Sequence, residues 1–121
     1  MDITIREVQG RYLVEGPPGQ PLIHSAEDIT LLIESCFPHD RLLLYPENLP
    51  EHFFDLSSGE AGEILQKLRN YHMRLAVVRS PALRLSSRFG ELLEEERRGP
   101  YFRLFDERAA AQSWLCSDGL V

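Results

Sequence analysis

The sequence predicts an α/β domain in which helices flank a mixed sheet of four to five strands. Two segments near the N-terminus alternate apolar and polar residues around Gly10, three later runs are short and almost wholly apolar, and amphipathic helical segments separate these runs. Strands that alternate with helices after a hairpin favour a sheet with a parallel portion and right-handed crossovers. The predicted element order is therefore β-β-α-β-α-β-α-β-α.

Length and charge limit the class of protein. The chain has 121 residues, 43% of them apolar, and a net charge of −6. This length suits one compact domain over residues 1–121, and the acidic charge disfavours binding to nucleic acid. No run approaches the roughly 18 to 20 consecutive apolar residues of a membrane span, and the N-terminus lacks the basic and apolar regions of a signal peptide. We therefore expect a cytoplasmic protein that binds neither nucleic acid nor membrane.

The first half of the chain is predicted to hold a hairpin, a helix and a buried strand. ITIREV and RYLVEG form the hairpin, and GPPGQP then interrupts regular structure. The helical segment SAEDITLLIESCF begins with Ser25 and has Asp28 three residues later, which resembles a capping box. Its apolar stripe consists of Ile29, Leu32, Ile33 and Cys36. The apolar run RLLLY is expected to form a strand covered on both faces.

The middle of the chain is predicted to hold two helices around a second buried strand, MRLAVV. The first helix runs from about Gly59 to Tyr71. The second begins at Ser86 or Ser87 and closes at Gly99. Three acids near its end, Glu94–Glu96, are expected to form a solvated face, because such a run cannot be buried without partners.

The C-terminal segment is predicted to add one strand and one helix. YFRLF is the last strand. The helix that follows has Asp106 as its cap and buries Ala110 and Trp114, which are spaced by four residues.

The stretch FFDLSSGEAGEILQKLRNY, residues 53–71, is the most patterned part of the chain. Together with the RLAVV that follows, it resembles the bacterial domain-of-unknown-function family 4180. The matching residues are Phe53, Phe54, Asp55, Leu56, Gly59, Ala61, Gly62, Glu63, Gln66, Lys67, Asn70 and Tyr71. The likeness covers nearly the whole chain, but Arg79 and Ser80 stand where the family usually has a Gly-Asp pair. The family carries no assigned activity.

The element order also resembles that of anti-sigma-factor-antagonist (STAS) domains. This resemblance implies a STAS-like arrangement and a protein-binding or ligand-sensing role. In those domains a serine at the start of a helix is a phosphorylation switch, and Ser57 and Ser58 stand in a comparable place. A phosphate there would be stabilised by the free N–H groups and the dipole of the helix N-terminus. The alternative is that one of these serines simply caps the helix.

The helix of the patterned stretch has two opposite faces. At 100° per residue, Ala61, Ile64, Leu65 and Leu68 share one side and are expected to face the core. Glu63, Gln66, Lys67 and Asn70 share nearly the opposite side. This second set is either an ordinary solvated surface, with Glu63 and Lys67 in the favourable i, i+4 order, or a surface that contacts a protein partner or ligand. Gly62, inside the helix, suggests a close approach there.

The chemistry-bearing residues give weaker signals. Asp55 and Glu63 could form the carboxylate pair of a small enzyme, although Asp55 is more readily explained by bonds to backbone near the helix start. Cys36 and His39 are a two-ligand fragment without the rest of a metal site. We therefore predict no metal and no cofactor. Phe53, Phe54 and Tyr71 either line a pocket or, as we favour, pack in the core.

The sequence therefore favours a regulatory module that binds another protein or a small ligand and catalyses no reaction. An enzyme centred on Asp55 and Glu63 is the first alternative, and a homodimeric structural component is the second.

Overall fold

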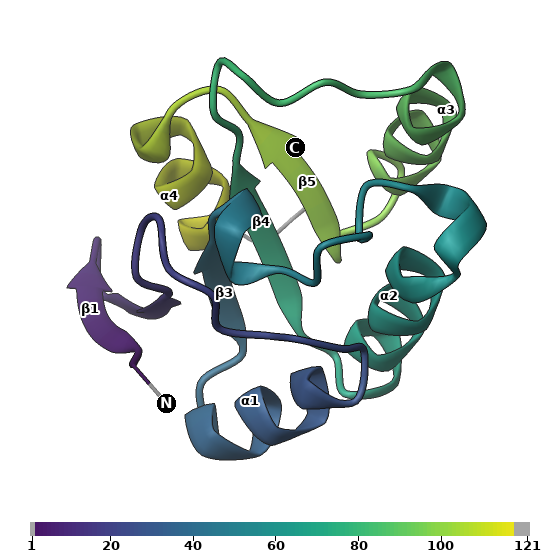
Figure 1. Ribbon diagram of the computed structural model, residues 1–121. Helices are drawn as coiled ribbons and strands as arrows, with labels where there is room; N and C mark the ends of the chain where they lie inside the picture. The colour runs from purple at the N-terminus through teal and green to yellow at the C-terminus, as the bar shows by residue number, and fades with distance from the viewer. Residues whose placement is uncertain (1, 118–121) are drawn as a thin grey trace.

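The computed structural model describes residues 2–117, which form a single α/β domain with the predicted element order (Figure 1). The strands are β1 (Thr4–Val8), β2 (Arg11–Glu15), β3 (Arg41–Leu44), β4 (Arg74–Val78) and β5 (Phe102–Phe105). The α-helices are α1 (Asp28–Cys36), α2 (Glu60–Asn70), α3 (Ser87–Glu96) and α4 (Arg108–Cys116). Two short 3₁₀ helices, η1 (Pro46–Asn48) and η2 (Leu56–Ser58), lie between β3 and α2.

The five strands form one mixed sheet in the order β1-β2-β3-β4-β5. β1 pairs with β2 in antiparallel fashion, as the alternation around Gly10 predicts, and each later strand is parallel to the one before it. All five residues of β4 are buried, which agrees with a strand that has neighbours at both edges and helices over both faces. The predicted mixed sheet is confirmed.

The helices divide unequally between the two faces of the sheet. Buried residues of α1, α2 and α3 share one apolar core with Leu42, Leu44, Leu75 and Val77 of the central strands. On the opposite face, α4 packs Ala111, Trp114 and Leu115 against a smaller core. Figure 1 shows α4 on one side of the sheet and α2 and α3 on the other. The carboxyl ends of the parallel strands lie at one edge of this three-layer structure.

The predicted core faces of the first two helices are confirmed. The buried residues of α1 are Ile29, Leu32, Ile33 and Cys36, and those of α2 are Ala61, Ile64, Leu65 and Leu68. α2 begins directly after Gly59, whose φ of +80° lies in the left-handed region that favours glycine. α3 begins after Ser86, whose side chain accepts a hydrogen bond from the backbone N–H of Phe89.

Two predicted helix starts are wrong. α1 begins at Asp28, whose carboxylate accepts a bond from the backbone N–H of His24, while Ser25 lies in the preceding turn. α4 begins at Arg108 after Glu107, and Asp106 does not cap it. Ala110 is exposed, and Ala111 is buried with Trp114 in its place.

Two predicted environments are also wrong. Glu96 does not belong to a solvated face, because it is buried and forms an ion pair with Arg69 of α2. Tyr71 does not pack in the core, because 49% of it is exposed at the end of α2. Glu94 and Glu95 are exposed as predicted.

Candidate functional site

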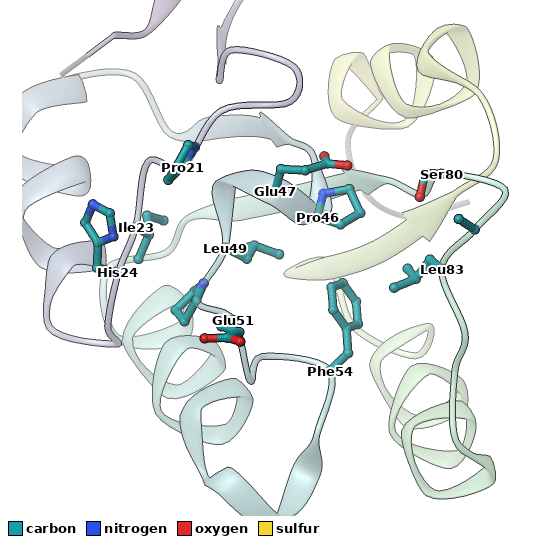
Figure 2. Close-up of a pocket in the computed structure, with 12 residues that line it drawn as sticks. Pro21, Ile23, His24, Pro46, Glu47, Leu49, Glu51, Phe54, Ser80 and Leu83 are labelled. Carbon is teal, nitrogen blue, oxygen red and sulfur yellow. The ribbon is translucent and has the colours of Figure 1, made fainter.

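A crevice of about 560 Å³ lies at the carboxyl edge of the sheet (Figure 2). It is formed by the connections that follow β2, β3 and β4. Its lining residues are Pro21, Ile23, His24, Pro46, Glu47, Leu49, Pro50, Glu51, Phe54, Ser80, Ala82 and Leu83. Ligand sites are usually concave surfaces lined by apolar side chains and a few polar groups, and this volume suits a small molecule. The crevice is therefore the candidate binding site.

Asn48 holds two of the three connections together. It is fully buried, and its side-chain amide donates to the carbonyls of Pro17 and Gln20, at 2.7 and 2.8 Å. Its side-chain oxygen accepts from the backbone N–H of Tyr45 at 2.7 Å, and its own carbonyl accepts from Ile23 N–H at 2.7 Å. Because every polar group of this side chain has a partner, Asn48 fixes the loops that carry two walls of the crevice.

Gly16 allows Asn48 to reach this position. A Cβ at residue 16 would lie 2.6 Å from the Asn48 side-chain oxygen and 2.9 Å from Leu44 Cδ2. Any side chain there would displace the amide that joins the loops. Sequence reasoning treated Gly16 only as part of a loop and did not single out Asn48.

The wall of the crevice is apolar and its rim is charged. Ile23 and Leu49 are buried, and Phe54 is partly buried against Phe53, with ring centroids 5.0 Å apart. At the rim, the two carboxylates of Glu47 and Glu51 are exposed. An apolar surface beside two carboxylates suits a ligand that has an apolar body and a basic group.

The three aromatic residues of the patterned stretch have three different environments. Phe53 is fully buried, as predicted, and contacts Phe89 and Phe102 in the core. Phe54 lines the crevice, which fulfils the alternative expectation of a pocket. Tyr71 lies at the C-terminal end of α2, where it neither packs in the core nor lines the crevice.

The predicted contact residues of α2 share one outer face of the helix. Glu63, Gln66 and Asn70 are exposed and Lys67 is half-buried. The Gln66 amide donates to the Asn70 side-chain oxygen at 3.0 Å. Within residues 2–117, no ion pair joins Glu63 to Lys67. None of these four residues lines the crevice, so the α2 surface is a separate candidate.

Ser57 and Ser58 lie in the exposed turn of η2. Ser57 donates to the Asp55 carboxylate from its hydroxyl, at 2.6 Å, and from its backbone N–H, at 3.0 Å. The Ser58 hydroxyl accepts from the N–H of Glu60, the first residue of α2, at 3.2 Å, and lies 2.8 Å from the carbonyl of His52. Ser58 thus binds the first N–H of α2, but the N-cap of this helix is Gly59 and not a serine, so the capping alternative is wrong in its residue. Phosphorylation of Ser57 or Ser58 stays a prediction.

The surroundings of Asp55 and Cys36 do not favour catalysis by either side chain. The hydrogen bonds from Ser57 lower the pKa of Asp55, which keeps that exposed carboxylate ionised. Burial raises the pKa of the Cys36 thiol to about 11, so the nucleophilic thiolate is scarce near neutral pH. Within residues 2–117, His, Cys, Asp and Glu side chains form no group of three that could hold a metal ion.

A buried carboxylate, Glu15, serves the sheet and not the crevice. It lies at the end of β2 under α4, where Arg108 and Gln112 bind its oxygens and Arg6 approaches to 3.5 Å. The hydrogen bond from Arg108 Nη2 to Glu15 raises the pKa of that guanidinium. These contacts hold the start of α4 against β2, and both carboxylate oxygens of Glu15 have partners.

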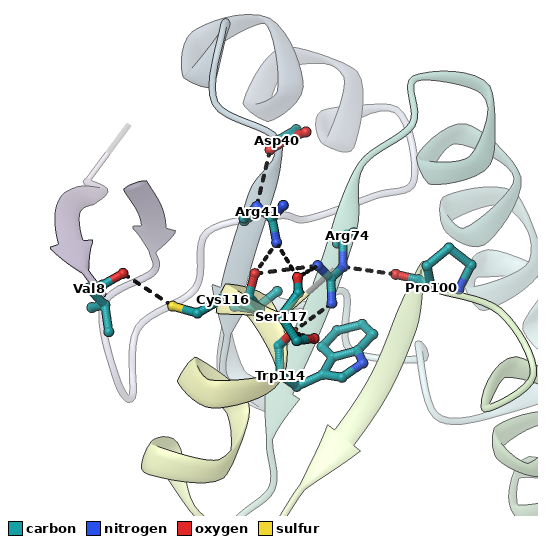
Figure 3. Close-up of polar contacts among 9 residues, drawn as sticks. Val8, Asp40, Arg41, Arg74, Pro100, Trp114, Cys116 and Ser117 are labelled. Atoms are coloured by element: carbon teal, nitrogen blue, oxygen red, sulfur yellow. Dashed lines mark hydrogen bonds and ion pairs between the residues drawn. The ribbon is translucent and has the colours of Figure 1, made fainter. Parts of the chain in front are cut away.

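Two arginines fasten the other end of α4 (Figure 3). Arg41 and Arg74, the first residues of β3 and β4, both donate to the carbonyls of Leu115 and Ser117, and Arg74 also donates to that of Trp114. The last carbonyls of a helix lack intrahelical donors and attract cations. This arginine cluster is therefore explained by helix termination.

Sequence reasoning missed the crevice because its walls come from three separated loops. One signal was available: both GPPGQP and PENLP directly follow strands of the parallel part of the sheet. Loops after successive parallel strands meet at one edge, so these proline-rich segments could have been placed side by side. The spacing of the rim residues Glu47 and Glu51 matches no known site motif, so it did not indicate a site.

These observations define a class of protein: an α/β domain in which one antiparallel strand extends a parallel sheet and a crevice crosses the carboxyl ends. The chain belongs to the family described as Domain of unknown function (DUF4180), whose model matches residues 8–115. The resemblance drawn from residues 53–71 is thus confirmed. No curated protein and no solved structure matches the chain, so the STAS-like arrangement stays a prediction. No helix within residues 2–117 is long and apolar enough to span a membrane.

Proposed function

We propose that this protein is a non-catalytic regulatory module that binds a small ligand in the crevice at the carboxyl edge of its sheet. The ligand has an apolar or aromatic body, which packs on Phe54 and Leu49, and a basic group, which pairs with Glu47 and Glu51. The observation that carries this proposal is the convergence of three successive loops on one apolar wall with two carboxylates at its rim.

The state of the reactive groups supports binding without turnover. The two acids at the rim are exposed, and the pKa of Asp55 is lowered, whereas a carboxylic acid that donates a proton near neutral pH needs a raised pKa. Cys36 is buried in the core among α1 residues and its pKa is raised. We therefore favour the binding module over the enzyme centred on Asp55 and Glu63.

The test uses two small aromatic probes that differ in charge. Phenethylamine carries a ring and an ammonium group, and 3-phenylpropanoate carries the same ring with a carboxylate. In titrations followed by amide NMR, phenethylamine should shift the resonances of Phe54, Leu49 and Leu83, and the carboxylate probe should not. Shifts spread evenly over the surface, or equal shifts with both probes, would contradict the proposal.

Variants test whether the rim carboxylates cause the preference for the positively charged probe. Glu47→Gln and Glu51→Gln together should weaken phenethylamine binding, because removing a carboxylate partner weakens attraction to the ammonium group. Glu91→Gln is the matched control, since Glu91 is equally exposed but lies on α3, outside the crevice. Equal affinity in the double variant would place the basic group elsewhere.

The outer face of α2 is the second candidate, for a protein partner. Glu63, Gln66 and Asn70 are exposed in a row beside the turn that carries Ser57 and Ser58. Phosphorylation of either serine would place a double negative charge at the start of this surface. The interaction of Gln66 with Asn70 also stabilises an isolated helix, so a binding measurement decides between the two roles.

A further inference from the structure

β5 leaves one edge of the sheet open. It is the last strand in the sheet order, with β4 on one side only. Toward β4, the carbonyls of Tyr101 and Phe105 accept from the N–H groups of Leu75 and Arg79, at 2.7 and 2.8 Å. Because backbone groups alternate in direction along a strand, the N–H and C=O groups between these two positions alternate as well. Those of Phe102 and Leu104 therefore point away from β4.

A groove of about 350 Å³ follows this open edge. Its lining residues are Arg79, Leu93, Glu94, Arg97, Arg103, Leu104, Phe105 and Asp106. Leu104 packs toward the core under α3, whereas Phe105 packs on Trp114 under α4. Side chains from opposite faces of β5 line the same groove, so the groove includes part of the strand's edge and its carboxyl end. An added strand would lie along this edge.

The groove is lined by three arginines and two carboxylates, an excess of one positive charge, although the whole chain carries −6. Arg79 pairs with Asp106 at 3.7 Å, and Arg97 pairs with Glu94 at 3.4 Å. Arg103 pairs with no carboxylate among residues 2–117.

The Arg103 side chain contacts α4 and the residue that follows α3. Its guanidinium carbon lies 5.2 Å from the Trp114 ring centroid, and its Nη2 donates to the Arg97 carbonyl at 3.1 Å. Its Nε is buried without a hydrogen-bond partner. Burial, and then the charge of Arg97, lower the pKa of Arg103. An anionic group at this edge would offset both effects.

We propose that the open edge of β5 binds an acidic segment of another protein as an added strand. Its backbone pairs with Phe102 and Leu104, and its carboxylates reach Arg97 and Arg103. Main-chain bonds give affinity in such strand addition, and side chains give specificity. A second copy of this chain suits the edge less, because an antiparallel pair of β5 strands centred on Arg103 would set two like charges opposite each other.

The test uses a blocked peptide that alternates glutamate with valine, and a control peptide that alternates lysine with valine. The glutamate peptide should slow the hydrogen exchange of the Phe102 and Leu104 amides and leave the β1 amides unchanged. The lysine peptide should bind at least about tenfold more weakly, because its ammonium groups would face the arginines and be repelled. This site is separate from the crevice, so failure of the amine probe there does not affect the result.

Charge reversal supplies a matched pair of variants. Arg97→Glu should weaken the glutamate peptide about tenfold. Arg98→Glu, at the neighbouring exposed position that does not line the groove, should leave binding unchanged. The proposal is overturned by binding that does not protect the Phe102 and Leu104 amides, by equal binding of both peptides, or by no binding. It is also overturned if the protein alone dimerises with those two amides protected, since a second copy is then the occupant.

Discussion

The guanidinium of Arg74 lies over the indole ring of Trp114, with its central carbon 4.4 Å from the ring centroid. The same guanidinium donates to the Trp114 carbonyl at 2.6 Å and to the Ser117 carbonyl at 2.7 Å. One side chain therefore stacks on the aromatic residue of α4 and also donates to carbonyls at the end of that helix (Figure 3). Burial lowers the pKa of Arg74 to about 10, so the guanidinium is charged throughout the neutral range.

Arg74→Met should cost about 2 to 5 kcal/mol of unfolding free energy, because it removes several charge-assisted hydrogen bonds worth about 1.5 to 3 kcal/mol each, while the donors from Arg41 and Ser117 to the same carbonyls remain. Urea denaturation followed by fluorescence measures this loss, since Trp114 is the one tryptophan in the chain and is only 6% exposed. Arg74→Lys is the control for charge: it keeps the cation but loses the planar fork, so it should recover part of the loss at most. Native fluorescence typical of water-exposed tryptophan would contradict the whole arrangement.

The strands and most core faces were predictable because they depend on local periodicity. The alternation on both sides of Gly10 predicts the hairpin, and the four apolar positions of α2 fix its buried face from spacing alone. The prediction for α4 placed the cap one residue early, at Asp106 in place of Glu107. Its buried alanine was also wrong: residues three and four before Trp114 both lie near it on a helix, so spacing alone does not choose between Ala110 and Ala111.

Contacts between distant segments were not predictable from single-sequence patterns. Glu96 looks like one of three solvated acids, and only the packing of α3 beside α2 brings Arg69 to it. Asn48 looks like a loop residue, and only the fold places it against Gly16. The crevice belongs to the same class, because its walls are near in space and far apart in sequence.

Gly16→Ala should lower the free energy of unfolding by about 1 to 3 kcal/mol, since the new methyl group would overlap the Asn48 side chain at 2.6 Å. It should also weaken phenethylamine binding, because Asn48 fixes the loops of the crevice. Thermal unfolding and the NMR titration measure the two effects. A fully stable variant with intact probe binding would show that the two loops do not depend on this close approach.

Gly62→Ala should stabilise the protein by about 1 kcal/mol, the usual difference between the two residues inside a helix. The position is exposed, and a Cβ there would meet nothing within 4 Å, so packing within residues 2–117 does not require the glycine. Gly90→Ala in α3 is the matched control, because its Cβ also enters open space. Gly62→Ala could stabilise the fold and still lower the affinity for a partner. If Gly90→Ala leaves that affinity unchanged, the close approach predicted at Gly62 is made by the partner.

Cys36 should resist alkylation in the folded protein. Its side chain is buried and its pKa is about 11, so both access and thiolate formation oppose the reaction. With iodoacetamide near pH 8, mass spectrometry should find Cys36 unmodified until urea unfolds the chain. Cys36→Ser provides the reference for any labelling of Cys116. Rapid modification of Cys36 under native conditions would mean that α1 opens easily.

The α2 surface is tested by replacing its three exposed polar residues together, as Glu63→Ala, Gln66→Ala and Asn70→Ala. Because these side chains lie away from the core, the free energy of unfolding should change by no more than about 1 kcal/mol. If this surface binds a partner, the triple variant should fail to retain proteins that the unaltered chain captures from a bacterial lysate.

The control for this capture is a pair of exposed substitutions on α3, Glu91→Ala and Glu95→Ala, which lie outside the β5 groove and should leave the captured proteins unchanged. Capture that survives both sets would show that the polar face of α2 is a solvated surface, stabilised locally by the bond between Gln66 and Asn70.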